Sequence, residues 1–218
     1  MYPTLICDDF FANPDSIVEY ANTLTYTSGN GKWPGKRTEP LDKINPELQE
    51  QIAIKLLKMF FPEERYMYVA NMTFQKITPF HEDKYHPKNR GWIHRDHDVL
   101  CGGIIYLTKN PEKDTGTSIY SSKTLSESNY TDKSEECKQK FYTNNEVADD
   151  EYNAEFKSTE DEWEETICVQ NVYNRLFMFN NQQYHGVKTF GSGTNERLTL
   201  AFFFKNICTS KSPPPLYR

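Results

Sequence analysis

The sequence lacks the features of secreted, disulfide-stabilised and membrane-spanning proteins. Its five cysteines, at positions 7, 101, 137, 168 and 208, are scattered, odd in number and without any Cys-x-x-Cys pair. This fits free thiols in a reducing cytoplasm better than a disulfide framework or a zinc site. The longest apolar runs, such as residues 200–204, are too short to span a bilayer, and residues 1–9 contain neither the basic nor the apolar region of a signal peptide. We therefore expect a cytoplasmic protein with no membrane partner.

The chain also has no net positive charge: its formal net charge is −6. Residues 144–166 alone contain ten acidic residues and one lysine, and no segment is rich in Lys and Arg. Nucleic acids are bound through clustered positive charge, so a nucleic-acid partner is not expected. Nothing in the composition indicates an oligomeric state.

Apolar residues are scarce only in residues 109–166, and the rest of the chain has the content of a packed domain. The 14 Phe, 14 Tyr and 3 Trp can supply much of the core burial. Asn-Pro-acid triplets at 13–15 and 45–47 predict N-terminal caps of helices spanning 13–24 and 48–61. From residue 66 onward the pattern predicts short strands, which favour a sandwich, jelly roll or barrel: 66–78, 91–96, 99–108, 116–120, 166–170, 175–179, 184–188 and 197–205.

Two of these strands contain residues that could bind a metal ion. If residues 92–96 form a strand, Trp92, His94 and Asp96 share one face, so the imidazole and the carboxylate can reach one ion. A lone His-x-Asp is more often a surface pair. However, His185 lies on a later strand, and two His plus one carboxylate form the facial triad of non-haem Fe(II) oxygenases.

Arg197 begins a strand that is mostly apolar on both faces: Arg197, Thr199, Ala201 and Phe203 point one way, and Leu198, Leu200, Phe202 and Phe204 the other. A buried guanidinium requires an anionic partner, because an unpaired buried charge is very costly. The sequence does not distinguish between two kinds of anionic partner for Arg197. One is an internal Asp or Glu, and the other is a carboxylate ligand held by the guanidinium fork.

His94, Asp96, His185 and Arg197, in this order and on these strands, resemble the Fe(II)/2-oxoglutarate-dependent dioxygenase superfamily, in particular its prolyl-4-hydroxylase-like branch. Residues 103–108 (Gly-Ile-Ile-Tyr-Leu-Thr) are similar to that branch's Tyr-Leu-Asn strand. Residues 116–118 are similar to its Gly-Gly-Thr turn, although Thr115 replaces the first glycine, and residues 185–199 are similar to its His…Val…Arg ending. The resemblance implies a mainly β fold with flanking helices, a double-stranded β-helix (jelly roll, cupin-like).

The resemblance also implies the site. His94, Asp96 and His185 would be the catalytic metal ligands, and Arg197, with Tyr106 and Thr199, would hold the distal carboxylate of 2-oxoglutarate. The implied cofactors and co-substrates are Fe(II), 2-oxoglutarate and O2, with ascorbate optional. The implied reaction is hydroxylation of a C–H bond in an amino-acid, peptide or small-molecule substrate, with release of succinate and CO2. The alternatives are a non-catalytic jelly-roll binding module and an oxidative nucleic-acid demethylase.

Taken with the resemblance, the sequence predicts one domain over residues 1–218. Residues 1–66 would provide an N-terminal strand and bracing helices, 67–206 the double-stranded β-helix, and 207–218 a tail. Residues 121–165 form a polar, acidic insertion, which we expect at the rim of the active site. It is expected to be disordered or to contain one short helix carrying Tyr152 and Phe156, without a core of its own, and its acids would favour a neutral or basic substrate.

Overall fold

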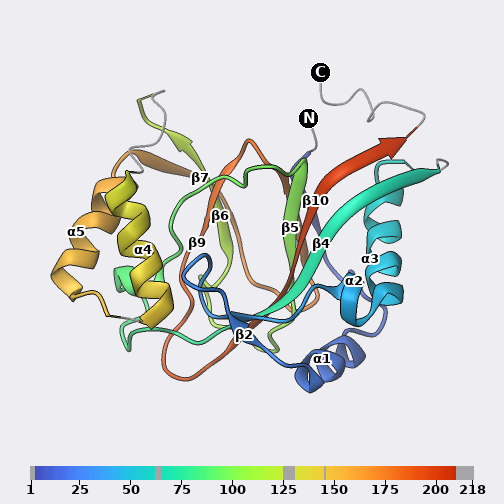
Figure 1. The fold of residues 1–218 in the computed structure, drawn as a ribbon, viewed down its shortest axis with the longest axis horizontal. Helices are drawn as coiled ribbons and strands as arrows, with labels where there is room; N and C mark the ends of the chain where they lie inside the picture. The colour runs from blue at the N-terminus through green and yellow to red at the C-terminus, as the bar shows by residue number, and fades with distance from the viewer. Residues whose placement is uncertain (1–2, 62–64, 125–130, 145, 210–218) are drawn as a thin grey trace.

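The computed structural model describes residues 3–61, 65–124, 131–144 and 146–209 and is built on two antiparallel sheets (Figure 1). The larger sheet has the order β1 (Leu5–Cys7), β8 (Leu176–Asn180), β5 (Cys101–Tyr106), β10 (Arg197–Thr209), β4 (Tyr66–Ile77), β3 (Lys36–Arg37) and β2 (Thr27–Ser28). The smaller sheet has the order β7 (Trp163–Val169), β6 (Thr117–Ser122) and β9 (Tyr184–Val187). This double-stranded β-helix with flanking helices confirms the predicted fold class.

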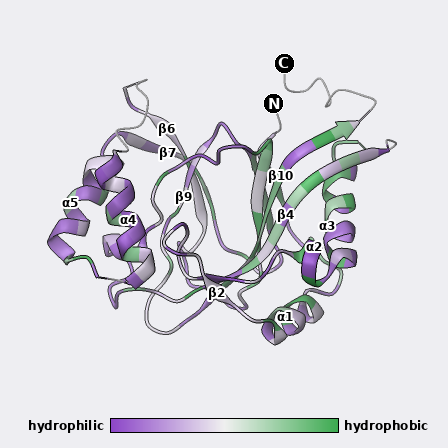
Figure 2. Ribbon diagram, in the orientation of Figure 1, coloured by the Kyte–Doolittle hydropathy of each residue, from purple (hydrophilic) through white to green (hydrophobic). Residues whose placement is uncertain are grey.

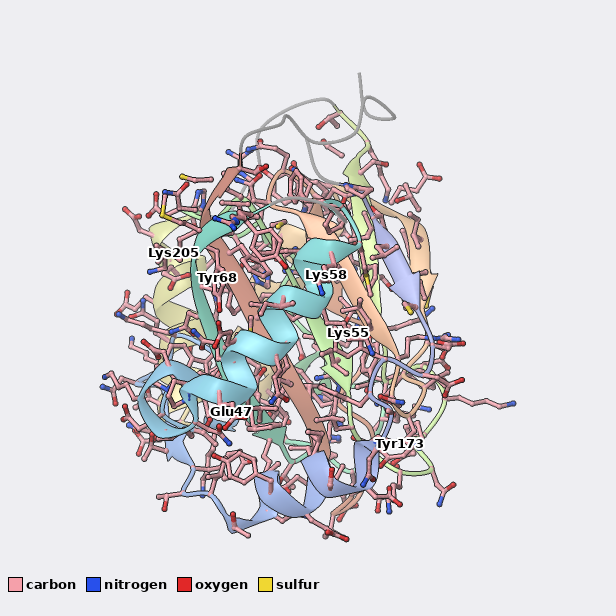
Figure 3. All side chains as sticks on the ribbon, turned by 90° about the vertical axis from the view of Figure 1, so that its right-hand side faces the viewer. Glu47, Lys55, Lys58, Tyr68, Tyr173 and Lys205 are labelled. Atoms are coloured by element: carbon pink, nitrogen blue, oxygen red, sulfur yellow. The ribbon has the colours of Figure 1, made fainter. Side chains whose placement is uncertain are left out.

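Helices α1 (Pro14–Thr23), α2 (Leu41–Ile44) and α3 (Pro46–Lys58) cover one face of the larger sheet (Figure 1). As predicted, the Asn13 and Asn45 side chains cap α1 and α3 by accepting hydrogen bonds from backbone N–H groups three residues on. The apolar face of α3 joins the main core, whereas Glu47, Lys55 and Lys58 lie on its solvent side (Figure 3). The helices therefore brace the sheet from outside.

Strand β10 runs through the centre of the larger sheet, between β4 and β5. Leu198, Leu200, Phe202 and Phe204 belong to the core beneath the helices, and Arg197 lies on the opposite face, as the alternation predicts. The strand continues to Thr209, so residues 207–209 of the expected tail are part of the sheet, and 210–218 lie outside the described residues.

Residues 91–96 do not form the expected strand. The segment contacts β9 through the Gly91 N–H, which donates to the Val187 carbonyl at 2.8 Å, and through an isolated bridge between His94 and His185. If the antiparallel pairing between residue 91 and residue 187 continued without interruption, residue 93 would lie opposite His185. The structure instead places His94 there. One extra residue therefore interrupts the pairing in the manner of a β-bulge, which ends the ladder and re-aims the side chains.

The insertion contains two helices, α4 (Asp132–Asn144) and α5 (Asp149–Glu160), rather than one, and β7 begins at Trp163. Their outer surfaces are hydrophilic (Figure 2), but their facing sides bury a satellite core, and the expectation that the insertion has no core is wrong. Its members are Trp92, Cys137, Phe141, Tyr142, Val147, Tyr152 and Phe156. A few aromatic side chains are enough to form this core, because each of them buries a large apolar area. Within the described parts of the chain, every helix is too short or too polar to traverse a bilayer.

Candidate active site

A cavity of about 290 Å³ opens between the two sheets. Its walls come mainly from the loop before β3, the inner face of the larger sheet, the segment 91–96 with β9, and the inner side of α4, and Thr117 of β6 and Phe190 complete them. His94, Asp96, His185 and Arg197 all line it. The structure therefore brings together, in one cavity, four residues that the sequence separates by up to about a hundred positions.

His94, Asp96 and His185 form a compact group in which one candidate ligand atom from each lies within 4.8 Å of the others. The Asp96 carboxylate lies beside both rings, with Oδ1 3.9 Å from His94 Nε2 and Oδ2 3.6 Å from His185 Nε2. Asp96 Oδ2 is buried and has no hydrogen-bond partner among the described residues. A buried carboxylate oxygen of this kind requires a cation or a donor.

The backbone fixes the two imidazoles in the form that binds metal ions. His94 Nδ1 lies 2.8 Å from the Trp92 carbonyl and His185 Nδ1 lies 3.1 Å from the Gln183 carbonyl. A carbonyl only accepts, so each Nδ1 carries the proton and each Nε2 offers its lone pair toward Asp96. Desolvation by the cleft walls, with the neighbouring His185, lowers the pKa of His94 to about 4, although 46% of its side chain is reached by solvent. The donor set therefore fits a divalent first-row metal ion.

Arg197 is 3% exposed on the wall of the same cavity. Its Nε donates to the Thr115 carbonyl at 3.0 Å, and its Nη2 is buried without a hydrogen-bond partner among the described residues. No described carboxylate forms an ion pair with it, so the described residues do not supply the internal salt bridge that was the alternative. Burial lowers the pKa of this guanidinium, which remains a desolvated cation facing the cavity.

Residues 1–204 match the sequence model of one family, described as "Family of unknown function (DUF6445)". The chain belongs to the DUF6445 family. No curated protein matches the sequence.

The fold of this DUF6445 protein is that of the 2-oxoglutarate/Fe(II) oxygenases. HygX from Streptomyces hygroscopicus, solved with nickel and 2-oxoglutarate bound, matches with a TM-score of 0.54 at 11% identity, over 92% of this chain and 82% of that one. The epimerase SnoN from nogalamycin biosynthesis gives 0.54 at 10% identity, over 92% and 77% of the chains. A prolyl hydroxylase from Trichoplax adhaerens gives 0.52 at 11% identity, over 92% and 82%.

In the DUF6445 protein, Tyr106 and Thr199 lie opposite each other on β5 and β10, beside Arg197. The Arg197 guanidinium is 5.4 Å from the Tyr106 ring. The hydroxyls of Tyr106, Thr199 and Thr117 are all buried without a hydrogen-bond partner among the described residues. Burial raises the pKa of Tyr106, an effect that the positive charge of Arg197 partly offsets. Of these three, only Thr117 lines the cavity, and it was not selected as a site residue from the sequence.

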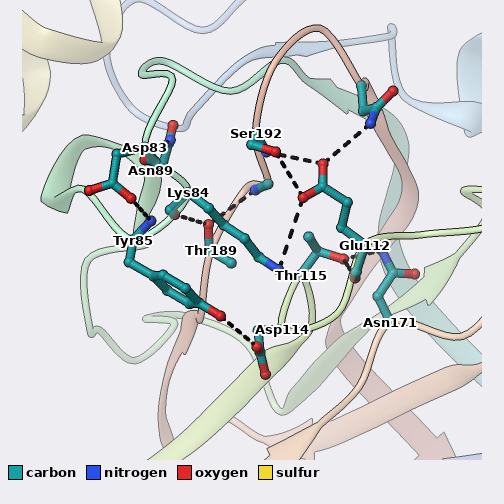
Figure 4. A network of polar contacts seen from close by, with 12 residues as sticks. Asp83, Lys84, Tyr85, Asn89, Glu112, Asp114, Thr115, Asn171, Thr189 and Ser192 are labelled. Carbon is teal, nitrogen blue, oxygen red and sulfur yellow. Dashed lines mark hydrogen bonds and ion pairs between the residues drawn. The ribbon is translucent and has the colours of Figure 1, made fainter.

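A polar network positions Thr115, whose carbonyl accepts the hydrogen bond from Arg197 Nε (Figure 4). The Thr115 hydroxyl donates to the Glu112 carbonyl at 2.7 Å and accepts from Asn171 Nδ2 at 3.1 Å. The Glu112 carboxylate in turn accepts from the backbone N–H and the hydroxyl of Ser192, at 3.1 and 3.0 Å. The loop before β6 and the loop before β10 are thus tied together at the base of the arginine.

None of the described acidic residues of the insertion lines the cavity, and two of them form ion pairs with the segment before the His94 region. Asp149 pairs with Lys88 at 2.7 Å, and Glu160 pairs with Arg90 at 2.6 Å. Burial raises the pKa of Glu160 to about 7. From α4 the cavity is lined by Lys138 and Tyr142, so the insertion borders the cavity, but no described acidic residue of the insertion lines it, which removes the physical basis for a preference for basic substrates. Neither residue was selected from the sequence, although their spacing of four places them on one helix face.

The remaining histidines lie elsewhere. His97 is exposed, and His81 and His86 do not line the cavity. The rings of His81 and His86 stack at 3.9 Å near Asp149. Each Nδ1 accepts a backbone N–H from two residues on, at 2.9 and 3.2 Å, so each Nε2 carries a proton and has no lone pair for a metal ion.

Proposed function

We propose that this protein is an Fe(II)- and 2-oxoglutarate-dependent dioxygenase that hydroxylates a C–H bond of an amino-acid, peptide or small-molecule substrate. One observation carries the proposal: a His94–Asp96–His185 group with free Nε2 lone pairs shares a cavity with a buried arginine that has no anionic partner among the described residues. The fold shared with 2-oxoglutarate/Fe(II) oxygenases supports it. We further propose that residues 1–218 act as one domain.

Each residue of the site has a defined task in this proposal. His94 and His185 would bind the metal ion through Nε2, and Asp96 through its carboxylate. When bound, the ion supplies the activation of O2 that couples breakdown of 2-oxoglutarate to succinate and CO2 with oxidation of the substrate. Arg197 would hold the distal carboxylate through Nη2, which has no hydrogen-bond partner among the described residues, and the hydroxyls of Tyr106 and Thr199 would assist it.

The alternatives explain less of the cavity. A jelly-roll binding module has no need for both a metal-binding triad and an unpaired buried arginine, because the arginine is costly without a ligand. An oxidative nucleic-acid demethylase needs a basic surface for phosphates, whereas the net charge is −6.

Metal binding provides the first test. The Asp96→Ala variant should bind Fe(II), titrated anaerobically by calorimetry, at least about 100-fold more weakly, since even residues that only orient a ligand contribute 10–100-fold. His97→Gln is the matched control, because His97 is exposed, next to Asp96 in sequence and outside the cavity. Succinate formation from labelled 2-oxoglutarate in the presence of pooled amino acids, peptides and metabolites would then measure turnover. Equal affinity of wild type and Asp96→Ala for Fe(II) would reject the triad.

A further inference from the structure

A second arginine, Arg37, faces the same cavity from the edge of the larger sheet. It lies on β3 opposite Gln75 of β4, which lies opposite Thr199 of β10. Directly paired residues of neighbouring strands project from the same side of a sheet, so Arg37 and the row containing Thr199 share the inner face. The guanidinium lies 4.7 Å from the Trp33 ring and 5.9 Å from the Phe203 ring.

This guanidinium has few partners. Its Nε is buried without a hydrogen bond among the described residues, and its Nη2 has a long contact of 3.4 Å with Gln75 Oε1. Trp33 Nε1, from the same loop, is likewise buried and unpartnered among them. Burial lowers the pKa of Arg37 to about 10 and the charge of Asp96 opposes that change, so Arg37 is still a cation at neutral pH.

The N–H groups of this guanidinium are largely unused, since its one hydrogen bond among the described residues is the long contact with Gln75. A guanidinium that packs against rings with its face keeps its N–H groups in the plane, where they form a fork suited to a carboxylate. Arg37 forms no ion pair with a carboxylate of the described chain. Like Arg197, Arg37 is therefore a cavity-lining arginine without a carboxylate partner among the described residues. The two arginines lie on different parts of the cavity wall.

The charges of the site indicate what this fork would bind. In the proposed function, the two negative charges of 2-oxoglutarate together with Asp96 balance those of the metal ion and Arg197. Lys138 already pairs with Glu135 at 3.4 Å, and Lys32 is exposed to solvent. Among the described residues that line the cavity, Arg37 is then the one half-buried cation whose charge is not matched, and a single negative charge would match it.

We propose that Arg37 binds a carboxylate of the substrate that is oxidised, so that this substrate is a monocarboxylate with an apolar body. This inference rests on the proposed function. The apolar body follows from the cavity lining, because Trp33 and Phe203 lie beside Arg37, and Ile104 and Phe179 line the same cavity. A carboxylate is favoured over a phosphate monoester because the latter would bring about one extra negative charge at neutral pH into a site that is otherwise balanced.

Binding without turnover tests the inference. The protein is loaded with Ni(II), the ion bound with 2-oxoglutarate in HygX, and saturated with 2-oxoglutarate. It is then titrated, by calorimetry and by tryptophan fluorescence, with matched pairs of arylalkanoic acids and their carboxamides, beginning with 3-phenylpropanoate and 3-phenylpropanamide. Wild type should bind the acids roughly 10- to 100-fold more tightly than the amides, the range expected for a charge-assisted hydrogen-bonded pair.

The variants separate this inference from the proposed function. Arg37→Gln should lose the preference for acids, Arg37→Lys should recover only part of it because the fork is missing, and Lys36→Gln, exposed on the same short strand, should keep it. All three should bind 2-oxoglutarate as wild type does. If wild type binds acids and amides equally, or binds neither, the inference is overturned while 2-oxoglutarate binding leaves the proposed function standing. If 2-oxoglutarate itself fails to bind, both are overturned.

Discussion

Replacing Arg197 with methionine should weaken the ligand complex and strengthen the empty protein. The guanidinium is 3% exposed, has one hydrogen bond to the Thr115 carbonyl and leaves Nη2 unpartnered among the described residues. Removing one partner of a buried charge pair costs about 3–5 kcal/mol, so affinity for 2-oxoglutarate should fall by roughly 10²- to 10³-fold. Replacing an unpaired buried charge by an apolar side chain of similar length should raise the free energy of unfolding of the empty protein by about 1–3 kcal/mol, after the loss of the Thr115 contact.

Urea denaturation with and without 2-oxoglutarate, on the Ni(II)-loaded protein, measures both effects. At a ligand concentration of about 100 times its dissociation constant, wild type should gain about 2.7 kcal/mol, and Arg197→Met at the same concentration should gain almost nothing. Arg175→Met is the control, because Arg175 pairs with Asp8 outside the cavity, so this variant should lose a little stability and no affinity. An Arg197→Met protein that is less stable when empty, or that binds 2-oxoglutarate as tightly as wild type, would refute the assignment.

Two further predictions concern the insertion. Because burial raises the pKa of Glu160 to about 7, its contribution to stability is present below pH about 4.5 and is lost as the pH rises through 7, by up to about 3 kcal/mol. Glu160→Gln cannot ionise and should flatten the stability profile between those values in denaturation experiments at a series of pH values, whereas parallel profiles would contradict this. Tyr152→Phe removes the acceptor of the Trp92 Nε1–H, which donates at 2.9 Å, and should lower the free energy of unfolding by about 1–3 kcal/mol. Tyr85→Phe, at an exposed hydroxyl, should change it far less, and equal losses would contradict the prediction.

Local patterns predicted the parts of the fold that depend on neighbouring residues. The Asn13 and Asn45 caps lie within three residues of the N–H groups they bind, and the alternation along β10 assigned Arg197 and Leu198 to opposite faces. The satellite core was missed because Trp92, on the segment beside β9, has its hydrogen-bond partner sixty residues later. Composition averaged over the insertion cannot show that a few aromatic side chains face one another.

The candidate site also contains residues that the sequence could predict and residues that it could not. The convergence of His94, Asp96 and His185 was predicted because the resemblance supplied the pairing of distant strands, and the structure places their ligand atoms together. Arg37 had no such signal. It reaches the cavity only because its two-residue strand pairs with β4, and such a short strand has no periodicity to read.

The satellite core gives the protein a modular construction. The main core beneath the helices and the satellite core share no residue, yet α4 supplies part of the cavity wall through Lys138 and Tyr142. Substitutions on the inner side of α4 can therefore reshape the cavity without repacking the two sheets, which carry Arg197 on β10 and His185 on β9. In the proposed function, the positions on α4 that can vary would thus be separate from the strands whose residues would hold the metal ion and 2-oxoglutarate.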